Sequence, residues 1–158
     1  ILGRKEVGGI IGQMEPYLSL DLSAAAASLS ERYGIELDAN DVLTMASIVE
    51  REAVTEEQRP KVASVFYNRL RDGMRLQSDA TLTYSLGRAA TAEEINTLDD
   101  PYNTNLRAGL TPTPVCSPSL ASIQAACEPA DTNYYYFYIT QDTEQFSETY
   151  DEHMQAYS

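Results

Sequence analysis

Hydrophobic and polar residues in the middle of the chain follow two helical patterns. In the first, over residues about 40 to 53, the apolar side chains fall on one broad face of a helical wheel. The second, over residues about 60 to 72, keeps apolar side chains three and four positions apart after Pro60, a residue that fits the first turn of a helix. We therefore predict two packed helices, the first of them capped by Asp38 or Asn40.

Patterns on either side of this pair predict further helices and a small sheet. The stretch NYYYFYIT is aromatic and branched, as strands are, and a second strand is expected to return after a polar turn. The fold class predicted is α+β, with several helices packed on a small, mostly antiparallel sheet. The expected helices cover residues 22–33, 81–86, 91–98, 118–127 (capped by Ser117) and a last segment capped by Ser147; the strands cover 133–140 and 145–147. Residues 1–20 have no clear pattern.

Composition narrows the class of protein. The chain of 158 residues is expected to form one domain. Its net charge is −13, from 24 acidic and 11 basic residues, which argues against binding to nucleic acid or to anionic lipid. No run approaches the ~20 apolar residues of a membrane helix. Because the chain opens at Ile1 without an initiator Met, we expect it to be part of a longer protein.

Two glutamates, Glu50 and Glu52, interrupt the apolar face of the first helix. A carboxylate at the edge of such a face loses hydration, which raises its pKa and suits it to act as a general acid. The alternative is that both lie at the rim of the face and pair with Arg51, Arg59 or Lys61. Because the chain has a single His, no CxxC and no Gly-rich phosphate loop, we expect neither a metal site nor a cofactor.

Several ordered motifs resemble one known family. The segments LTMASIVERE, KVASVFYNRL and MRLQSDATLTYSLG, followed by the Tyr102-Asn103-Thr104 triplet and the Glu152-His153 pair, are similar to the catalytic domain of the endolytic murein transglycosylase (MltG, YceG-like) family. The resemblance covers residues 42–158 and implies a single catalytic domain over residues 1–158, in which residues 1–40 are weakly assigned. The sequence departs from the family pattern in its loops, at Ala80, Thr111, Thr113, Ser117 and Ser119.

The resemblance implies a reaction. Family members cleave peptidoglycan glycan strands between N-acetylmuramic acid and N-acetylglucosamine and leave 1,6-anhydromuramic ends, without a cofactor. The catalytic glutamate of the family pattern falls in SIVE, at Glu50, which acts first as general acid and then as base. Members carry an N-terminal membrane anchor and work at the extracytoplasmic face of the cell membrane. The resemblance also allows cell-wall synthases as protein partners.

Polar residues outside the first helix are candidates for binding the sugar. We expect the turn formed by Gln77, Ser78 and Asp79 to lie close to Glu50, with amide and carboxylate groups facing hydroxyl and N-acetyl groups. Tyr102, Asn103 and Thr104 are the second candidate group, because a Tyr ring stacks on a pyranose and an Asn can hold an acetamido group. The alternative is that the turn residues make local caps and that Tyr102 belongs to the core.

Two other functions stay open. A lysozyme-like hydrolase would use Glu52 or Asp79 to activate water. A glycan-binding or scaffolding domain would recruit cell-wall synthesis proteins without any catalysis. The products distinguish the three functions: a transglycosylase leaves anhydro ends, a hydrolase leaves reducing ends, and a binding or scaffolding domain leaves the glycan uncut.

The two cysteines are predicted to be unpaired thiols, with Cys127 buried. A helix from Pro118 to Cys127 would be about 15 Å long. Cys116 precedes that helix, whereas a disulfide needs Cα atoms within roughly 7 Å.

Overall fold

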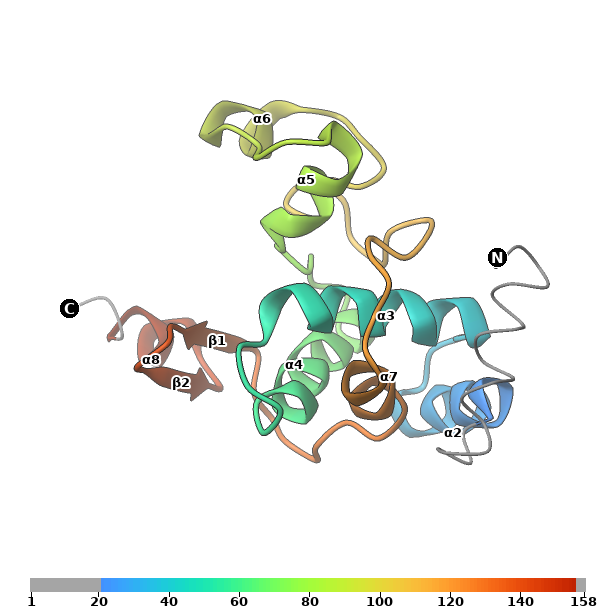
Figure 1. Cartoon of the computed structure of the whole chain (residues 1–158). Coiled ribbons are helices and arrows are strands. Elements are labelled where there is room, and N and C mark those ends of the chain that lie inside the picture. The colour runs from blue at the N-terminus through green and yellow to red at the C-terminus, as the bar shows by residue number, and fades with distance from the viewer. Residues whose placement is uncertain (1–20, 156–158) are drawn as a thin grey trace.

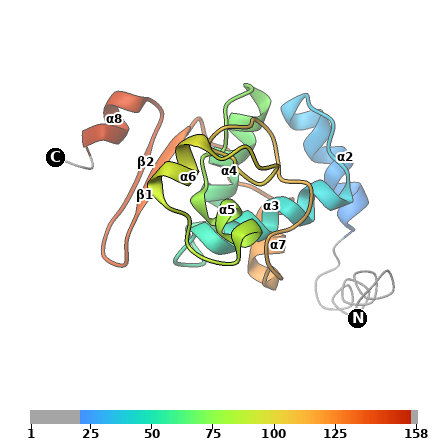
Figure 2. The same cartoon turned by 90° about the horizontal axis from the view of Figure 1, so that it is seen from above.

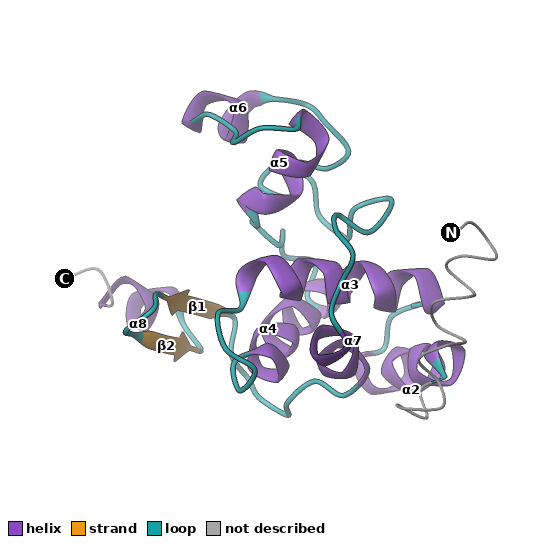
Figure 3. Cartoon of the chain, in the orientation of Figure 1, coloured by secondary structure: helices purple, strands orange, loops and turns teal. Residues whose placement is uncertain are grey.

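The computed structural model describes residues 21–155, and within this part helices pack on one small antiparallel sheet, so the predicted α+β class is confirmed (Figure 3). The weakly patterned residues 1–20 lie outside the described part. The elements are α2 (Leu22–Tyr33), α3 (Ala39–Glu52), α4 (Arg59–Arg71), α5 (Asp79–Leu86), α6 (Ala92–Thr97), α7 (Leu120–Cys127), β1 (Tyr136–Ile139), β2 (Glu144–Ser147) and α8 (Tyr150–Met154). Among the described helices, none is long and apolar enough to cross a membrane.

Helix α3 is the centre of the molecule. It lies between α2, α4 and α7 on one side and the pair α5 and α6 on the other (Figure 1). Most of its apolar face is fully buried, as at Met45 and Ile48. The two predicted helices are confirmed as α3 and α4, and Asp38 forms the expected cap as one half of a capping box with Asp41.

The core beneath α3 is held by aromatic and polar contacts between helices. The rings of Tyr33 and Tyr67 stack with centroids 5.1 Å apart, which joins α2 to α4. The Tyr67 hydroxyl donates a hydrogen bond of 2.7 Å to the carbonyl of Ala126 in α7. Because this buried hydroxyl has a partner, the large Tyr67 side chain can be fully enclosed without an unsatisfied polar atom.

The sheet is a two-stranded hairpin at the end of the molecule opposite α2 (Figure 2). Phe137 of β1 pairs with Phe146 of β2, and its ring meets Phe66 of α4 edge-on. The strand predicted over residues 133–140 is shorter than expected. The Asn68 amide donates to the carbonyls of Thr132 and Tyr134 and so binds this stretch to α4 before β1 begins.

The structure corrects two predicted helix caps and the predicted burial of Cys127. Helix α7 begins at Leu120 and is capped by Ser119, not Ser117. Ser147 pairs with Tyr136 in the sheet, so the last helix begins later and Thr149 caps it. Both cysteines are free thiols as predicted, but Cys127 is half-buried, and burial raises the pKa of its thiol to about 11.

Candidate active site

Glu52, the last residue of α3, faces the polar turn that precedes α5. The Ser78 hydroxyl donates a hydrogen bond of 2.7 Å to Glu52 Oε2. Ser78 is buried, and its backbone N–H donates to the Thr104 hydroxyl, which in turn donates to the Ser78 carbonyl. The loop around Thr104 therefore fixes the group that contacts Glu52.

The surroundings of Glu52 favour its protonated form. Burial is the largest influence and raises the pKa of this carboxyl. The hydrogen bond from Ser78 and the charge of Arg51 lower the pKa, whereas the nearby charge of Asp79 raises it. The resulting pKa of Glu52 lies above the ordinary value of glutamate. A carboxyl group with a raised pKa can hold the proton that a general acid gives away.

Glu52 lies in the wall of a pocket of about 240 Å³, which we call the Glu52 pocket. Polar, charged and aromatic side chains line it together, as they do in many ligand sites. The lining residues are Glu52, Phe66, Arg69, Leu76, Gln77, Tyr136, Phe137, Tyr150 and His153. They come from α3, α4, the segment after α4, β1 and α8, so the pocket exists only once the hairpin has packed on the helices.

Arg69 of α4 holds the two walls of this pocket together. The guanidinium donates to the Tyr135 carbonyl at 2.7 Å and, from Nη1, to the Arg75 carbonyl at 2.9 Å and the Gln77 side-chain oxygen at 3.2 Å. It also lies 5.0 Å from the centre of the Tyr136 ring. Arg69 is only 6% exposed, and burial lowers its pKa.

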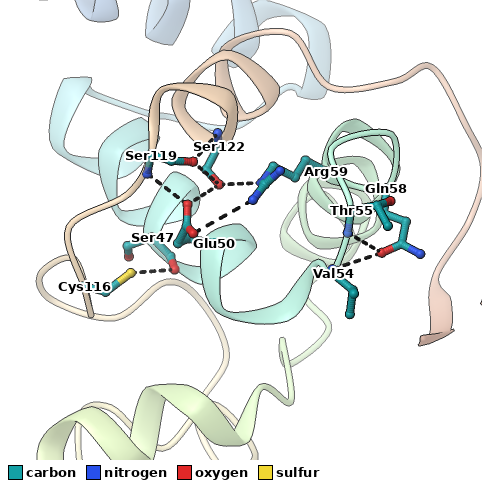
Figure 4. A network of polar contacts seen from close by, with 9 residues as sticks. All are labelled: Ser47, Glu50, Val54, Thr55, Gln58, Arg59, Cys116, Ser119 and Ser122. Carbon is teal, nitrogen blue, oxygen red and sulfur yellow. Dashed lines mark hydrogen bonds and ion pairs between the residues drawn. The ribbon is translucent and has the colours of Figure 1, made fainter. Parts of the chain in front are cut away.

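Glu50 faces a different part of the molecule. Its carboxylate accepts hydrogen bonds from the Ser119 backbone N–H at 2.9 Å and the Ser122 hydroxyl at 2.8 Å, at the start of α7 (Figure 4). Arg59 lies 3.9 Å away as an ion-pair partner. The alternative that both glutamates pair with basic side chains therefore holds for Glu50, which pairs with Arg59, whereas the Glu52 carboxylate accepts a hydrogen bond from Ser78.

This setting keeps Glu50 ionised. Desolvation raises the pKa of Glu50, but the hydrogen bonds from Ser119 and Ser122 and the charge of Arg59 outweigh it, so that the pKa lies below its ordinary value. The expectation of a raised pKa at Glu50 is therefore wrong, because the start of α7 and Arg59 replace the lost hydration. The assignment of proton transfer to Glu50 stays a prediction, and these surroundings weaken it.

The predicted polar turn divides into residues with different roles. Gln77 lines the Glu52 pocket, and its φ of 58° lies in the left-handed region that residues other than glycine rarely adopt. Ser78 contacts Glu52, while Asp79 is exposed and accepts a hydrogen bond from the Asn105 amide. The turn therefore meets Glu52, whereas the hydrogen-bond and ion-pair partners of Glu50 lie on α4 and α7.

Two members of the second predicted group, Asn103 and Thr104, have structural roles. Asn103 is fully buried, and its amide donates to three carbonyls at the end of α6, those of Glu94, Ile95 and Leu98. Thr104 is 2% exposed and supports Ser78. Both side chains are buried and support the loop, which argues against their predicted role as sugar contacts; that role stays a prediction.

Tyr102 agrees in part with the alternative that it belongs to the core, while its role in stacking on a sugar stays a prediction. It is half-buried and packs against the hydrophobic core, as the core alternative has it. Its hydroxyl shares a hydrogen bond with the Thr113 hydroxyl, and its ring packs against Tyr84, which is 49% exposed. Tyr102 is not among the residues that line the Glu52 pocket.

Sequence reasoning did not identify Arg69, Tyr136 and Tyr150 as site residues. The sequence does contain an indication for Arg69, because this residue falls on the apolar face of α4 and a buried charged side chain needs a hydrogen-bond or ion-pair partner. His153, of the Glu-His pair, lines the pocket and stacks on Tyr136 with ring centroids 5.2 Å apart. Desolvation and the charge of Arg69 lower the pKa of His153, which favours the neutral imidazole.

No group of His, Cys, Asp and Glu within residues 21–155 could hold a metal ion. The chemistry that this arrangement offers is proton transfer by Glu52 in a partly apolar pocket, with amide and guanidinium groups beside it.

Comparisons with known proteins agree with the motifs. The profile of the YceG-like family matches residues 11–158. The endolytic murein transglycosylase of Bacillus subtilis (strain 168) is 41% identical over 137 residues, which cover 82% of this chain and 38% of the relative. The endolytic murein transglycosylase of Streptococcus pneumoniae serotype 2 is 33% identical over 138 residues, 83% of this chain and 24% of that protein.

A solved structure has the same fold. The crystal structure of a putative yceG-like protein from Listeria monocytogenes superposes with a TM-score of 0.69 at 36% identity, over 82% of this chain and 42% of that one. The chain thus spans less than half the length of these relatives. The match of the family profile across the helices, the hairpin and the Glu52 pocket shows that the chain belongs to the YceG-like family.

Proposed function

We propose that this chain is the catalytic part of an endolytic peptidoglycan lytic transglycosylase, with Glu52 as its acid and base. The relatives that carry this activity in their names support the reaction class. The observation that supports Glu52 is its position: it is partly buried in a pocket, has a raised pKa, and one oxygen is held by Ser78. Glu50 does not line this pocket, and its contacts with Ser119, Ser122 and Arg59 lower its pKa.

The reaction needs only one carboxyl group. Protonated Glu52 gives its proton to the glycosidic oxygen, and the bond between C1 of N-acetylmuramic acid and O4 of N-acetylglucosamine breaks. The same carboxylate, now ionised, takes the proton of the muramic C6 hydroxyl as O6 forms a bond to C1. The product is a 1,6-anhydro end, no water is consumed, and Glu52 is protonated again for the next cycle.

The neighbours of Glu52 support this cycle. The Ser78 hydroxyl donates to Oε2 of Glu52, whereas Oε1 of Glu52 has no hydrogen-bond partner among the residues that the structure describes. We therefore take Oε1 as the oxygen that faces the substrate. The hydrogen bond from Ser78 also stabilises the carboxylate that forms after the first step. The exposed amide of Gln77, held in its position by Arg69, can bind the acetamido group of a sugar over Glu52.

A hydrolase is the second candidate, and Asp79 is the observation that favours it. Its charge is near enough to influence Glu52, as the second carboxylate of a glycoside hydrolase would be. In that mechanism Asp79 would activate water, and the product would carry a reducing end. The acetamide-binding and proton-transfer roles of the pocket would be the same.

The relatives are named as murein transglycosylases, which supports a substrate in the cell wall. We therefore propose that the protein works at the extracytoplasmic face of the cell membrane, held there by a segment outside this chain. Contact with cell-wall synthases is part of the same proposal.

Mass spectrometry of glycan strands digested by the purified chain tests the function. Transglycosylase activity gives fragments with 1,6-anhydromuramic ends, which are 18 Da lighter than the hydrolysis product because no water is added. Fragments with reducing ends would support the hydrolase instead. Intact strands after long incubation would support a glycan-binding or scaffolding domain.

A further inference from the structure

A second pocket adjoins the Glu52 pocket. It has a volume of about 440 Å³. The two pockets share Arg69, Gln77, Tyr136 and Tyr150, and the second is completed by Gly73, Met74 and Arg75, so we call it the Arg75 pocket. A ligand bound over Glu52 can therefore extend into the Arg75 pocket along a shared wall.

The Arg75 pocket carries positive charge that nothing on the described chain neutralises. No Asp or Glu lines it. Arg75 is exposed and has no hydrogen bond or ion pair from its side chain to the described residues, and the hydrogen bonds of Arg69 go to carbonyl and amide oxygens rather than to a carboxylate. The carboxylate closest in sequence, Asp72, is bound by Arg71 and by the Tyr135 hydroxyl.

This is unusual for the chain, which has 24 acidic and 11 basic residues. A lone arginine on a convex surface would simply be hydrated, but Arg75 lines a concave site next to the proposed acid. Its backbone is also fixed, because Arg69 donates to its carbonyl at 2.9 Å and the next residues are tied by the hydrogen bond from Gln77 N–H to the Thr104 carbonyl at 3.0 Å. The guanidinium therefore starts from a rigid base at the edge of the site.

A carboxylate is the ligand that such a site selects. Guanidinium groups bind carboxylates with two parallel hydrogen bonds, and neighbouring concave walls exclude some of the competing water. In a peptidoglycan strand, the two sugars differ in this respect. N-acetylmuramic acid carries an O3-lactyl group that ends in a carboxylate or, when amidated, in a stem peptide with carboxylates of its own, whereas N-acetylglucosamine is neutral.

We propose that the Arg75 pocket binds the carboxylate carried by the O3 substituent of the muramic acid, and that Arg75 makes the protein select acidic over neutral glycan. This inference rests on the proposed function, because it takes the glycan strand as the ligand of the adjoining Glu52 pocket. It assigns a role to a pocket that the proton transfer does not use.

Binding titrations of three oligosaccharides of equal length test this proposal. They are peptide-free glycan with its lactyl carboxylate, peptide-bearing glycan, and a chitin oligosaccharide that contains only N-acetylglucosamine. Arg75→Gln is expected to weaken binding of at least one carboxylate-bearing glycan about tenfold, the effect of one charge-assisted contact, and to leave the chitin oligosaccharide unchanged. Arg107→Gln is the control, because it removes the same charge from an exposed pair with Asp99.

Each outcome bears on the proposal. An effect on peptide-free glycan identifies the lactyl carboxylate as the ligand, and an effect confined to peptide-bearing glycan identifies the stem peptide. Equal binding by the wild type and Arg75→Gln, equal weakening for chitin, or no binding of any oligosaccharide overturns the proposal. Because the readout is binding, Arg75-dependent binding without anhydro products would refute the proposed function alone, and cleavage without Arg75 dependence would refute this inference alone.

Discussion

The hydroxyl of Ser78 donates a 2.7 Å hydrogen bond to Glu52 Oε2 and so connects the end of α3 to the turn before α5. Both groups are shielded from water, Ser78 at 2% exposure and Glu52 in the wall of its pocket. Ser78 favours the ionised carboxylate, while burial and Asp79 oppose it. The proton affinity of Glu52 therefore depends on neighbours that can be changed one at a time.

Replacement of Ser78 by alanine is expected to raise the pKa of Glu52 further, because the carboxylate loses the hydrogen bond that stabilises it. A general acid must be protonated, so the alkaline limb of the pH–rate profile should move to higher pH. The measurement is the rate of glycan cleavage against pH, with the substitution of the exposed Ser85 of α5 by alanine as the control. An alkaline limb that stays in place would mean that Glu52 is not the group that titrates.

Asp79→Asn should have the opposite effect. The substitution removes a negative charge that raises the pKa of Glu52 and keeps the oxygen that accepts from Asn105. The alkaline limb should therefore move to lower pH, while the products keep their anhydro ends. Asp99→Asn, an exposed carboxylate paired with Arg107, controls for net charge. Loss of all cleavage in a folded Asp79→Asn protein would instead support the hydrolase, in which Asp79 activates water.

Glu50→Gln is expected to destabilise the fold in a manner that depends on pH. Because the folded pKa of Glu50 is lowered, its stabilising effect is complete above the pKa of unfolded glutamate, about 4.3, and is lost as the pH falls through the lower folded pKa. We expect a loss of about 1 kcal/mol at neutral pH, since the side chain is 27% exposed and solvent screens the ion pair with Arg59.

Denaturant unfolding at pH 7 and pH 3 measures this effect. The difference in unfolding free energy between wild type and Glu50→Gln should be largest at pH 7 and shrink at pH 3. A difference that grows on acidification would contradict the lowered pKa.

Arg69→Met should destabilise the protein and damage the pocket. The substitution keeps the apolar stem but leaves the carbonyls of Tyr135 and Arg75 without their donor, for an expected cost of about 2 kcal/mol. Arg71→Met, on the exposed side of the same helix, should cost less than about 1 kcal/mol. Thermal melting of both variants checks the difference, and equal melting temperatures would show that Arg69 does not hold the pocket walls.

The helices were predictable from the sequence because their apolar residues repeat with the period of a helix. The same periodicity could not distinguish Glu50 from Glu52, since both lie at edges of the apolar face of α3. Their chemical difference comes from partners that are remote in sequence. Ser119 and Ser122 come from α7, and Ser78 comes from the turn before α5.

The ends of elements were less predictable for a related reason. The aromatic run over residues 133–140 predicts a strand longer than β1, but the Asn68 amide binds the carbonyls of Thr132 and Tyr134 to α4. Likewise, Asn103 reads as a polar sugar contact, although its donors are used on three carbonyls at the end of α6. Polar side chains that satisfy distant backbone groups cannot be identified from local patterns.

The most direct test of the account compares Glu52→Gln with Glu50→Gln in the release of anhydro-ended fragments from purified glycan strands, with thermal melting at neutral pH. Glu52→Gln should lower the rate by at least ~10²-fold, the effect of losing one proton-transfer group, and should melt at or above the wild-type temperature because a buried carboxylate is removed. Glu50→Gln should keep its rate within a few-fold and melt lower. A folded Glu52→Gln protein with wild-type activity, beside an inactive Glu50→Gln protein, would contradict the assignment of the acid to Glu52.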